Sequence, residues 1–201
     1  MELGKLPLVI RNSDFDEKGF VRTQEGILVP AYVGSQKGFN PNDKGDLAVF
    51  YEQLRKRKVL ALCPFKACEE YLDFSKVNDD MTVREAKAFW DDFNRTAGAV
   101  NYGILMPYSK FMIAILDGSH ACDDGVCAEI GYYAARHNKP IVGIRGDMRL
   151  AENIAAPINP AVRYFMDKGP YNGLFFSGPS AYDDALDGIE KLAEEILNQS
   201  N

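Results

Sequence analysis

Short apolar runs alternate with segments of helical periodicity along this chain, and that alternation constrains the fold more than any other feature. Phe111–Leu116 (FMIAIL) is a continuous apolar run, which is typical of a strand buried on both faces of a parallel sheet. Val126–His137 has helical spacing of its apolar residues, and the next apolar run is Pro140–Ile144 (PIVGI). Because parallel strands are joined by crossover helices, the pattern predicts an α/β fold with an open parallel sheet.

The expected sheet has about five strands and carries helices on both faces, as flavodoxin-like and Rossmann-like folds do. Its remaining strands are expected in three apolar stretches, at residues 27–33, 58–63 and 173–176. Further helices are expected from the spacing of apolar residues at 46–57, after residue 82, and at 186–197.

Two local patterns add detail to this arrangement. Thr82 followed by Glu85 has the spacing of a capping box, which predicts the start of a helix. We expect Trp90 and its aromatic neighbours on that helix to belong to the core, and the alternative is that they form a stacking platform. Residues 1–26 are interpreted as an N-terminal extension, which could form a hairpin, and residues 27–201 as a single domain.

Composition and charge exclude several classes of function. The formal net charge is −6, whereas a nucleic-acid-binding surface normally carries a basic stripe. No apolar run approaches the ~20 residues of a membrane span, and the N-terminus has no signal-peptide pattern, so we expect a cytoplasmic protein. The four cysteines, at 63, 68, 122 and 127, lack CxxC spacing. We therefore expect free thiols, with no metal site and no cofactor.

The stretch CDDGVCAEIGYYAARHNKP, residues 122–140, lies where a ligand is expected to bind. In an open parallel sheet, ligands bind beyond the carboxyl ends of the strands, and Asp117 ends the apolar run there. Gly125 allows a ligand to approach the backbone closely. Glu129 follows near the start of the next helix, where free N–H groups favour an ionised carboxylate that can serve as nucleophile or general base. The alternative is that these carboxylates only cap the helix.

The sequence LDGSHACDDGVCAEIGYYAARHNKPIVGIRGDMR resembles the nucleoside 2-deoxyribosyltransferase family. The matching motif consists of an aspartate after the strand and then D-x-G-x-x-x-E-[IL]-G, and the resemblance extends over residues 111–165. It implies that Glu129 attacks C1′ of a 2′-deoxynucleoside and that Asp123 protonates the departing base. The expected partners are therefore a deoxynucleoside and a free nucleobase.

The resemblance also implies several binding residues. Asp117 and Gly125 belong to the matching motif, and Asn159 corresponds to an asparagine that reaches the sugar from a neighbouring subunit. This implies a homo-oligomer built from dimers with shared active sites. Tyr32 is the candidate for the family's tyrosine at the end of the first strand. The alternatives are that Asn159 only caps the following helix and that Tyr32 is a core residue.

Two other functions remain open at this stage. The loop after the first strand, GSQKG at residues 34–38, is similar to the GSxxG loop of deoxynucleoside 5′-monophosphate N-glycosidases. Ser35 is the candidate phosphate-binding residue there, so a hydrolase acting on nucleosides or their 5′-monophosphates is an alternative. A non-catalytic nucleotide-binding module is another. The resemblance does not predict base selectivity, because Tyr108, Ser109 and Lys110 stand where the family usually has a further aspartate.

Overall fold

One mostly parallel sheet forms the centre of the computed structural model, which describes residues 15–24, 26–37, 41–69, 71–78, 80–117, 122–147, 158–167 and 173–200. Within these residues the strands are β1 (Val21–Thr23), β2 (Gly26–Ser35), β3 (Val59–Leu62), β4 (Phe111–Ile115), β5 (Ile141–Arg145) and β6 (Leu174–Ser177). The helices are α1 (Pro41–Lys56), α2 (Pro64–Glu69), η3 (Phe74–Lys76), α3 (Val83–Val100), η4 (Asn101–Leu105), α4 (Met106–Tyr108), α5 (Asp124–His137), α6 (Pro160–Asp167) and α7 (Ala181–Gln199).

The five parallel strands lie in the order β3-β2-β4-β5-β6. Counted along the chain, this is the 2-1-3-4-5 order of flavodoxin-like sheets. The sixth strand, β1, pairs antiparallel with the first residues of β2. The predicted fold class is therefore confirmed.

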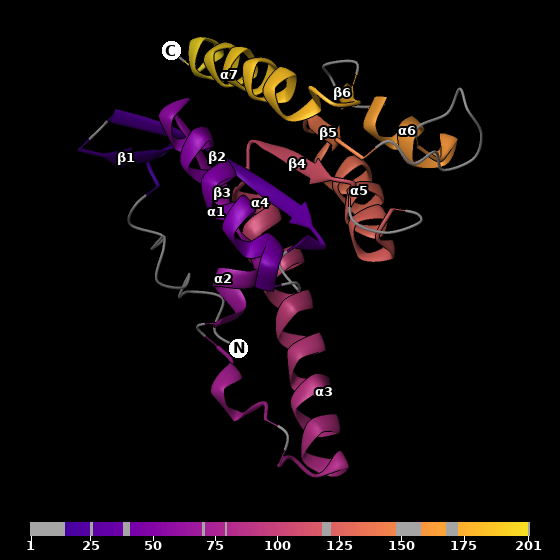
Figure 1. Cartoon of the computed structure of the whole chain (residues 1–201). Coiled ribbons are helices and arrows are strands. Elements are labelled where there is room, and N and C mark those ends of the chain that lie inside the picture. Colours follow the sequence, from indigo (N-terminus) through magenta and orange to yellow (C-terminus); the bar gives the residue numbers. More distant parts are fainter. Residues whose placement is uncertain are drawn as a thin grey trace.

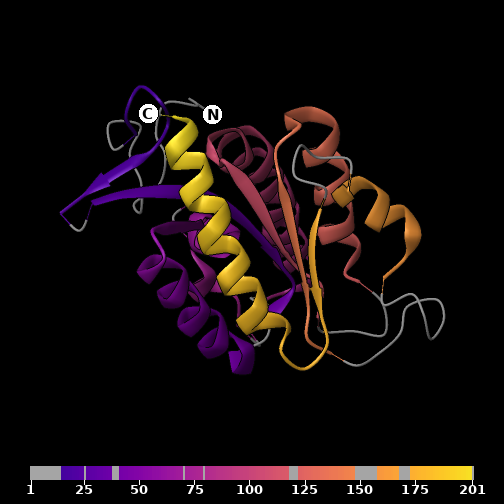
Figure 2. The ribbon, with the colours of Figure 1, turned by 90° about the horizontal axis from the view of Figure 1, so that it is seen from above.

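Each strand contributes to two core layers, because successive side chains point to opposite faces of the sheet. In β4, Met112 and Ala114 belong to one layer, which is covered by η4, α4, α5 and α6. Phe111, Ile113 and Ile115 belong to the other layer, which is covered by α1 and α7. Figure 2 shows α1 and α7 on one side of the sheet and α5 and α6 on the other. The expectation of helices on both faces is confirmed.

β2 is longer than expected and includes Pro30, a residue that central strands rarely tolerate. The ladder between β2 and β4 begins one residue later, where Ala31 pairs with Phe111. The carbonyl oxygen of Pro30 still accepts a hydrogen bond from Lys110 N at 2.7 Å, but its missing N–H falls before the ladder with β4. On the other side of β2, Pro30 pairs with Leu60 of β3. The hairpin of β1 and β2 attaches the described part of residues 1–26 to this same sheet.

The capping box at the start of α3 is confirmed, since Glu85 N donates to Thr82 Oγ1 and Thr82 N donates to Glu85 Oε2. Figure 1 shows α3 extending away from the sheet. Its aromatic residues therefore lack a full cover, and the side chain of Trp90 is 44% exposed. The expectation that Trp90 belongs to the core is wrong, because helical periodicity identifies an apolar face without showing what covers it.

Candidate functional site

A change in the direction of the crossovers creates a crevice between β2 and β4. The chain leaves β2 for α1 on one face of the sheet and leaves β4 for α5 on the opposite face. The two strands end side by side, with Ser35 paired to Ile115. Such a switch point is where open α/β sheets bind ligands.

A cavity of about 370 Å³ lies at this crevice. Its volume falls within the range of small-molecule sites, about 300–1,000 Å³. Four residues that the sequence predicted line it together, namely Ser35, Asp123, Gly125 and Glu129. The cavity also has an aromatic wall, which consists of Phe65, Phe74, Trp90 and Phe93.

Glu129 projects from α5 toward the end of β2. The hydroxyl of Tyr32 donates to Glu129 Oε1 at 2.6 Å, and Asn101 Nδ2 donates to the same oxygen at 3.2 Å. The other oxygen, Oε2, lies over Gly34, where an added Cβ atom would be 2.7 Å away. Glycine at this position therefore leaves the space that the carboxylate occupies.

Burial raises the pKa of Glu129 to about 7. The hydrogen bonds from Tyr32 and Asn101 oppose this rise because they stabilise the charged form, and the nearby charge of Asp123 adds to it. Burial and the charge of Glu129 also raise the pKa of Tyr32 well above its ordinary value, so Tyr32 remains a hydrogen-bond donor. The carboxyl group of Glu129 consequently exchanges protons near neutral pH, as catalytic acids and bases do.

Asp123 is the N-cap of α5, where its Oδ1 accepts a hydrogen bond from Val126 N at 3.0 Å. Gly125 makes room for this carboxylate, since an added Cβ atom would lie 2.9 Å from Asp123 Oδ1. The capping interpretation from the sequence thus describes a real contact. It does not exclude a chemical role, because Asp123 also lines the cavity.

Asp117 is nearly buried at the end of β4 and lies outside the cavity lining. Its Oδ1 accepts hydrogen bonds from the backbone N–H groups of Gly146 and Asp147, at 2.7 and 3.1 Å. Its Oδ2 accepts a hydrogen bond from the Tyr182 hydroxyl at 2.7 Å and lies 3.8 Å from Lys37 Nζ. Within this chain, Asp117 joins the segments that follow β2, β4 and β5.

Ser35 and Asn159 occupy different positions relative to the cavity. Ser35 is nearly buried and lines the cavity, and its Oγ accepts a hydrogen bond from Lys37 N at 3.1 Å. Asn159 precedes α6, and its Oδ1 accepts a hydrogen bond from Ala161 N at 2.9 Å. Asn159 does not line the cavity of its own chain. Its predicted action across a subunit interface remains a prediction, because the structure is of a single chain.

Sequence reasoning missed Asn101 and the aromatic wall of the cavity. Asn101 begins a π-helical turn at the end of α3, and such turns often occur at functional sites. No motif identifies this turn in the sequence. The signal for the aromatic wall was the spacing of Trp90 and Phe93 on one helix face, which also fits a face buried in the core.

The described residues hold no cluster of three or more metal-ligating side chains. The four cysteines carry free thiols. A hydrogen bond from Cys127 lowers the pKa of the Cys122 thiol to about 7. None of the helices in the described part of the chain is long and apolar enough to cross a bilayer.

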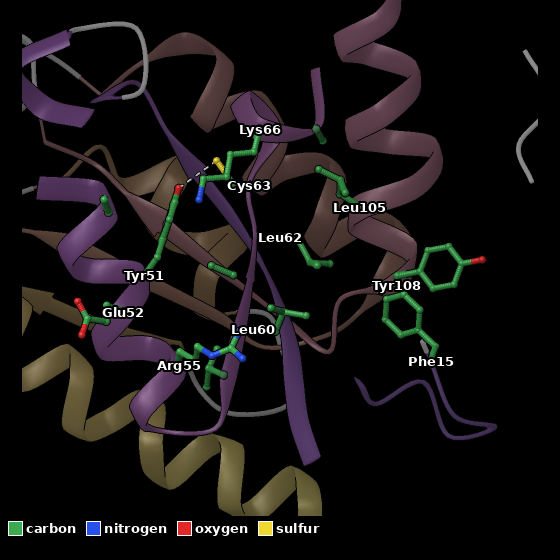
Figure 3. A pocket seen from close by; sticks show the side chains of 14 residues that line it. Phe15, Tyr51, Glu52, Arg55, Leu60, Leu62, Cys63, Lys66, Leu105 and Tyr108 are labelled. Carbon is green, nitrogen blue, oxygen red and sulfur yellow. Dashed lines mark hydrogen bonds between the residues drawn. The ribbon is translucent and has the colours of Figure 1, made fainter. Parts of the chain in front are cut away.

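A second cavity, of about 310 Å³, lies along the outer edge of β3 (Figure 3). Apolar side chains such as Leu60 line much of it. Toward one end, the Tyr51 hydroxyl donates to Cys63 Sγ at 3.4 Å, and toward the other the rings of Phe15 and Tyr108 stack 4.8 Å apart. The carboxylates of the first cavity do not line it, so the first cavity is the better candidate for chemistry.

Comparison of the sequence with models of protein families found no match, and comparison with characterised proteins found none either. The function is therefore inferred from the cavity and from the motif that surrounds Glu129.

Proposed function

We propose that this chain transfers 2-deoxyribose between nucleobases by cleaving the N-glycosidic bond of a 2′-deoxynucleoside. The observation that carries the proposal is the carboxylate of Glu129, which lies in the cavity with Oε1 held by two donors. No described residue donates a hydrogen bond to Oε2. The resemblance of residues 111–165 to nucleoside 2-deoxyribosyltransferases supports the same reaction.

Glu129 is the nucleophile in this proposal. Its Oε2 attacks C1′ from the face opposite the base, and the bond between C1′ and the base nitrogen breaks through an oxocarbenium-like transition state. The product of this step is an ester between deoxyribose and Glu129. A pKa of about 7 leaves a substantial ionised fraction at neutral pH, and partial burial removes water that would otherwise shield the attacking oxygen.

Asp123 is the acid that protonates the departing base. It lines the same cavity, and its charge acts on Glu129, so the two carboxyl groups are electrostatically coupled. In the second step the incoming base gives a proton to Asp123, and its nitrogen attacks C1′ and releases Glu129. Two inversions at C1′ give overall retention of configuration.

The aromatic wall suits a planar base. Trp90 and Phe93 lie edge to face with ring centroids 5.4 Å apart, and both line the cavity that contains Glu129. Aromatic rings pack well against heterocycles, and an apolar wall limits the access of water to the glycosyl-enzyme. These properties favour transfer to a second base over hydrolysis.

Incubation with deoxyinosine and free adenine, followed by chromatography, tests the proposal. Formation of deoxyadenosine is the expected result, and Glu129→Gln is expected to abolish it. Glu194→Gln is the matched control, because it removes an exposed carboxylate from α7 far from the cavity. If a panel of purine and pyrimidine deoxynucleosides is left intact by the wild-type protein, the proposal is wrong.

The hydrolytic alternative is favoured by Ser35, whose hydroxyl lies at the cavity beside the segment 34–37. Release of free deoxyribose 5-phosphate from a deoxynucleoside 5′-monophosphate, with loss of this activity in Ser35→Ala, would support a nucleotide N-glycosidase. Tight binding without turnover, unchanged in Glu129→Ala, would instead support a non-catalytic nucleotide-binding module.

A further inference from the structure

Asn101 has a hydrogen-bonding arrangement that its contacts within the chain leave incomplete. Its Nδ2 donates to Glu129 Oε1 at 3.2 Å, whereas its Oδ1 is buried and has no hydrogen-bond partner. A buried acceptor without a donor destabilises the folded protein, so each such atom calls for an explanation, and a ligand that donates to it is one. Asn101 also lines the cavity that contains Glu129.

The backbone around Asn101 is unusual as well. Asn101 O accepts a hydrogen bond from Met106 N, which is the i to i+5 pattern of a π-helical turn. Insertion of such a turn shifts the side chains that precede it relative to a regular helix. Here the turn occurs where α3 gives way to η4 and α4, ahead of β4, and Asn101 contacts the carboxylate at this point.

The orientation of the amide follows from its neighbour. An ionised carboxylate only accepts hydrogen bonds, so the NH₂ group of Asn101 must face Glu129 and the amide oxygen must face away from it. The Tyr32 hydroxyl occupies the other donor position on the same Oε1 atom. The amide oxygen of Asn101 is therefore an acceptor without a donor in this chain, on a residue that lines the same cavity as Glu129.

We propose that Asn101 binds the substrate directly, with its amide oxygen accepting a hydrogen bond from the 3′-hydroxyl group of the deoxyribosyl unit. This inference rests on the proposed deoxyribosyl transfer. In a β-deoxynucleoside the 3′-hydroxyl projects from the ring face opposite the base, and Glu129 attacks C1′ from that same face. The 5′-hydroxymethyl group lies on the base's face and so points away from Glu129 and Asn101.

Asn101 thereby has two contacts that act together. Its NH₂ group fixes the carboxylate of Glu129, and its amide oxygen fixes the sugar ring that Glu129 attacks. A substrate that lacks the 3′-hydroxyl leaves this acceptor unpaired. Sites that bind a substrate hydroxyl strongly reject analogues without it for this reason. The side chain selects sugars with a 3′-hydroxyl on the attacked face.

The test compares deoxyinosine with 2′,3′-dideoxyinosine, and with the 3′-epimer of deoxyinosine, in wild type, Asn101→Ala and Asn94→Ala. Asn94 is an exposed residue of the same helix and serves as the control. We expect wild type and Asn94→Ala to prefer deoxyinosine over both analogues by about tenfold or more in kcat/KM. In Asn101→Ala this preference is expected to fall to within about twofold. The preference is a ratio measured on one preparation, so partial misfolding leaves it unchanged.

A second measurement covers the case in which Asn101→Ala is inactive. Calorimetric Kd values for deoxyinosine and 2′,3′-dideoxyinosine are expected to differ in wild type and to converge in the variant. If the preference survives in Asn101→Ala, or if wild type does not discriminate between the sugars, the role of Asn101 is refuted while deoxyribosyl transfer stands. If wild type neither binds nor cleaves deoxynucleosides of any base, the proposed function itself is refuted.

Discussion

Replacement of Glu129 by glutamine is expected to stabilise the folded protein at alkaline pH and to leave it nearly unchanged at acidic pH. Burial raises the pKa of Glu129 from 4.5 to about 7, which corresponds to about 3 kcal/mol of unfavourable free energy for holding the ionised carboxylate in the folded state. The folded pKa lies above the unfolded one. The contribution of Glu129 to stability is therefore complete below about pH 4.5 and is lost as the pH rises to about 7.

Urea denaturation of wild type and Glu129→Gln at about pH 4 and about pH 8 measures this difference. Both proteins are neutral at this position at the lower pH, so their free energies of unfolding should agree within about 1 kcal/mol. At the higher pH the variant should gain about 3 kcal/mol relative to wild type. Glu194→Gln, at an exposed position, should show no such pH-dependent gain. Equal free energies for wild type and Glu129→Gln at both pH values would refute the assignment of a buried carboxylate with a raised pKa.

Three further predictions concern catalysis. Tyr32→Phe removes the 2.6 Å hydrogen bond that lowers the pKa of Glu129, so the acidic limb of the rate-against-pH profile should move to higher pH, and an unmoved limb would contradict this role. Asp123→Asn should keep the helix cap yet slow cleavage of natural deoxynucleosides by about 100- to 10,000-fold. The same variant should slow the cleavage of a nitrophenyl deoxyriboside much less, because that leaving group needs no protonation. Equal losses of rate for both kinds of substrate would make Asp123 a positioning residue. Asn159→Asp keeps an oxygen that can cap α6. If Asn159 acts across the interface, mixing this variant with Glu129→Ala should restore activity in mixed dimers. A mixture that stays inactive, although subunit exchange is demonstrated, would exclude that role.

The sheet was predictable because its strands are nearly continuous apolar runs separated by helical segments. Phe111–Leu116 was expected as a strand and β4 spans Phe111–Ile115, because short continuous apolar runs are typical of strands buried on both faces of a parallel sheet. The capping box at Thr82 was equally readable, since its two hydrogen bonds lie within four consecutive residues. The location of Glu129 at the ligand-binding edge of the sheet was predictable, because Glu129 lies near the start of the helix that follows β4.

The remaining parts of the site depend on contacts between distant segments. Asn101 and Glu129 are 28 positions apart in the sequence and meet through a π-helical turn, and neither feature has a sequence signature. Trp90 belongs to an apolar helix face, and periodicity cannot distinguish a face covered by the core from one that lines a cavity. The strand expected at residues 27–33 is longer at both ends, because Gly26 pairs with β1 and because Gly34 and Ser35 pair with β4.

The central claim is that Glu129 becomes covalently bound to deoxyribose during the reaction. Intact-protein mass spectrometry after mixing with a 2′-fluoro-2′-deoxyarabinonucleoside, whose fluorine slows release of the sugar, tests it directly. The expected result is a mass increase of one 2-fluoro-2-deoxyarabinosyl group, which peptide mapping places on Glu129 and which Glu129→Gln lacks. An adduct on another residue would contradict the account, as would rapid turnover of deoxynucleosides by Glu129→Gln.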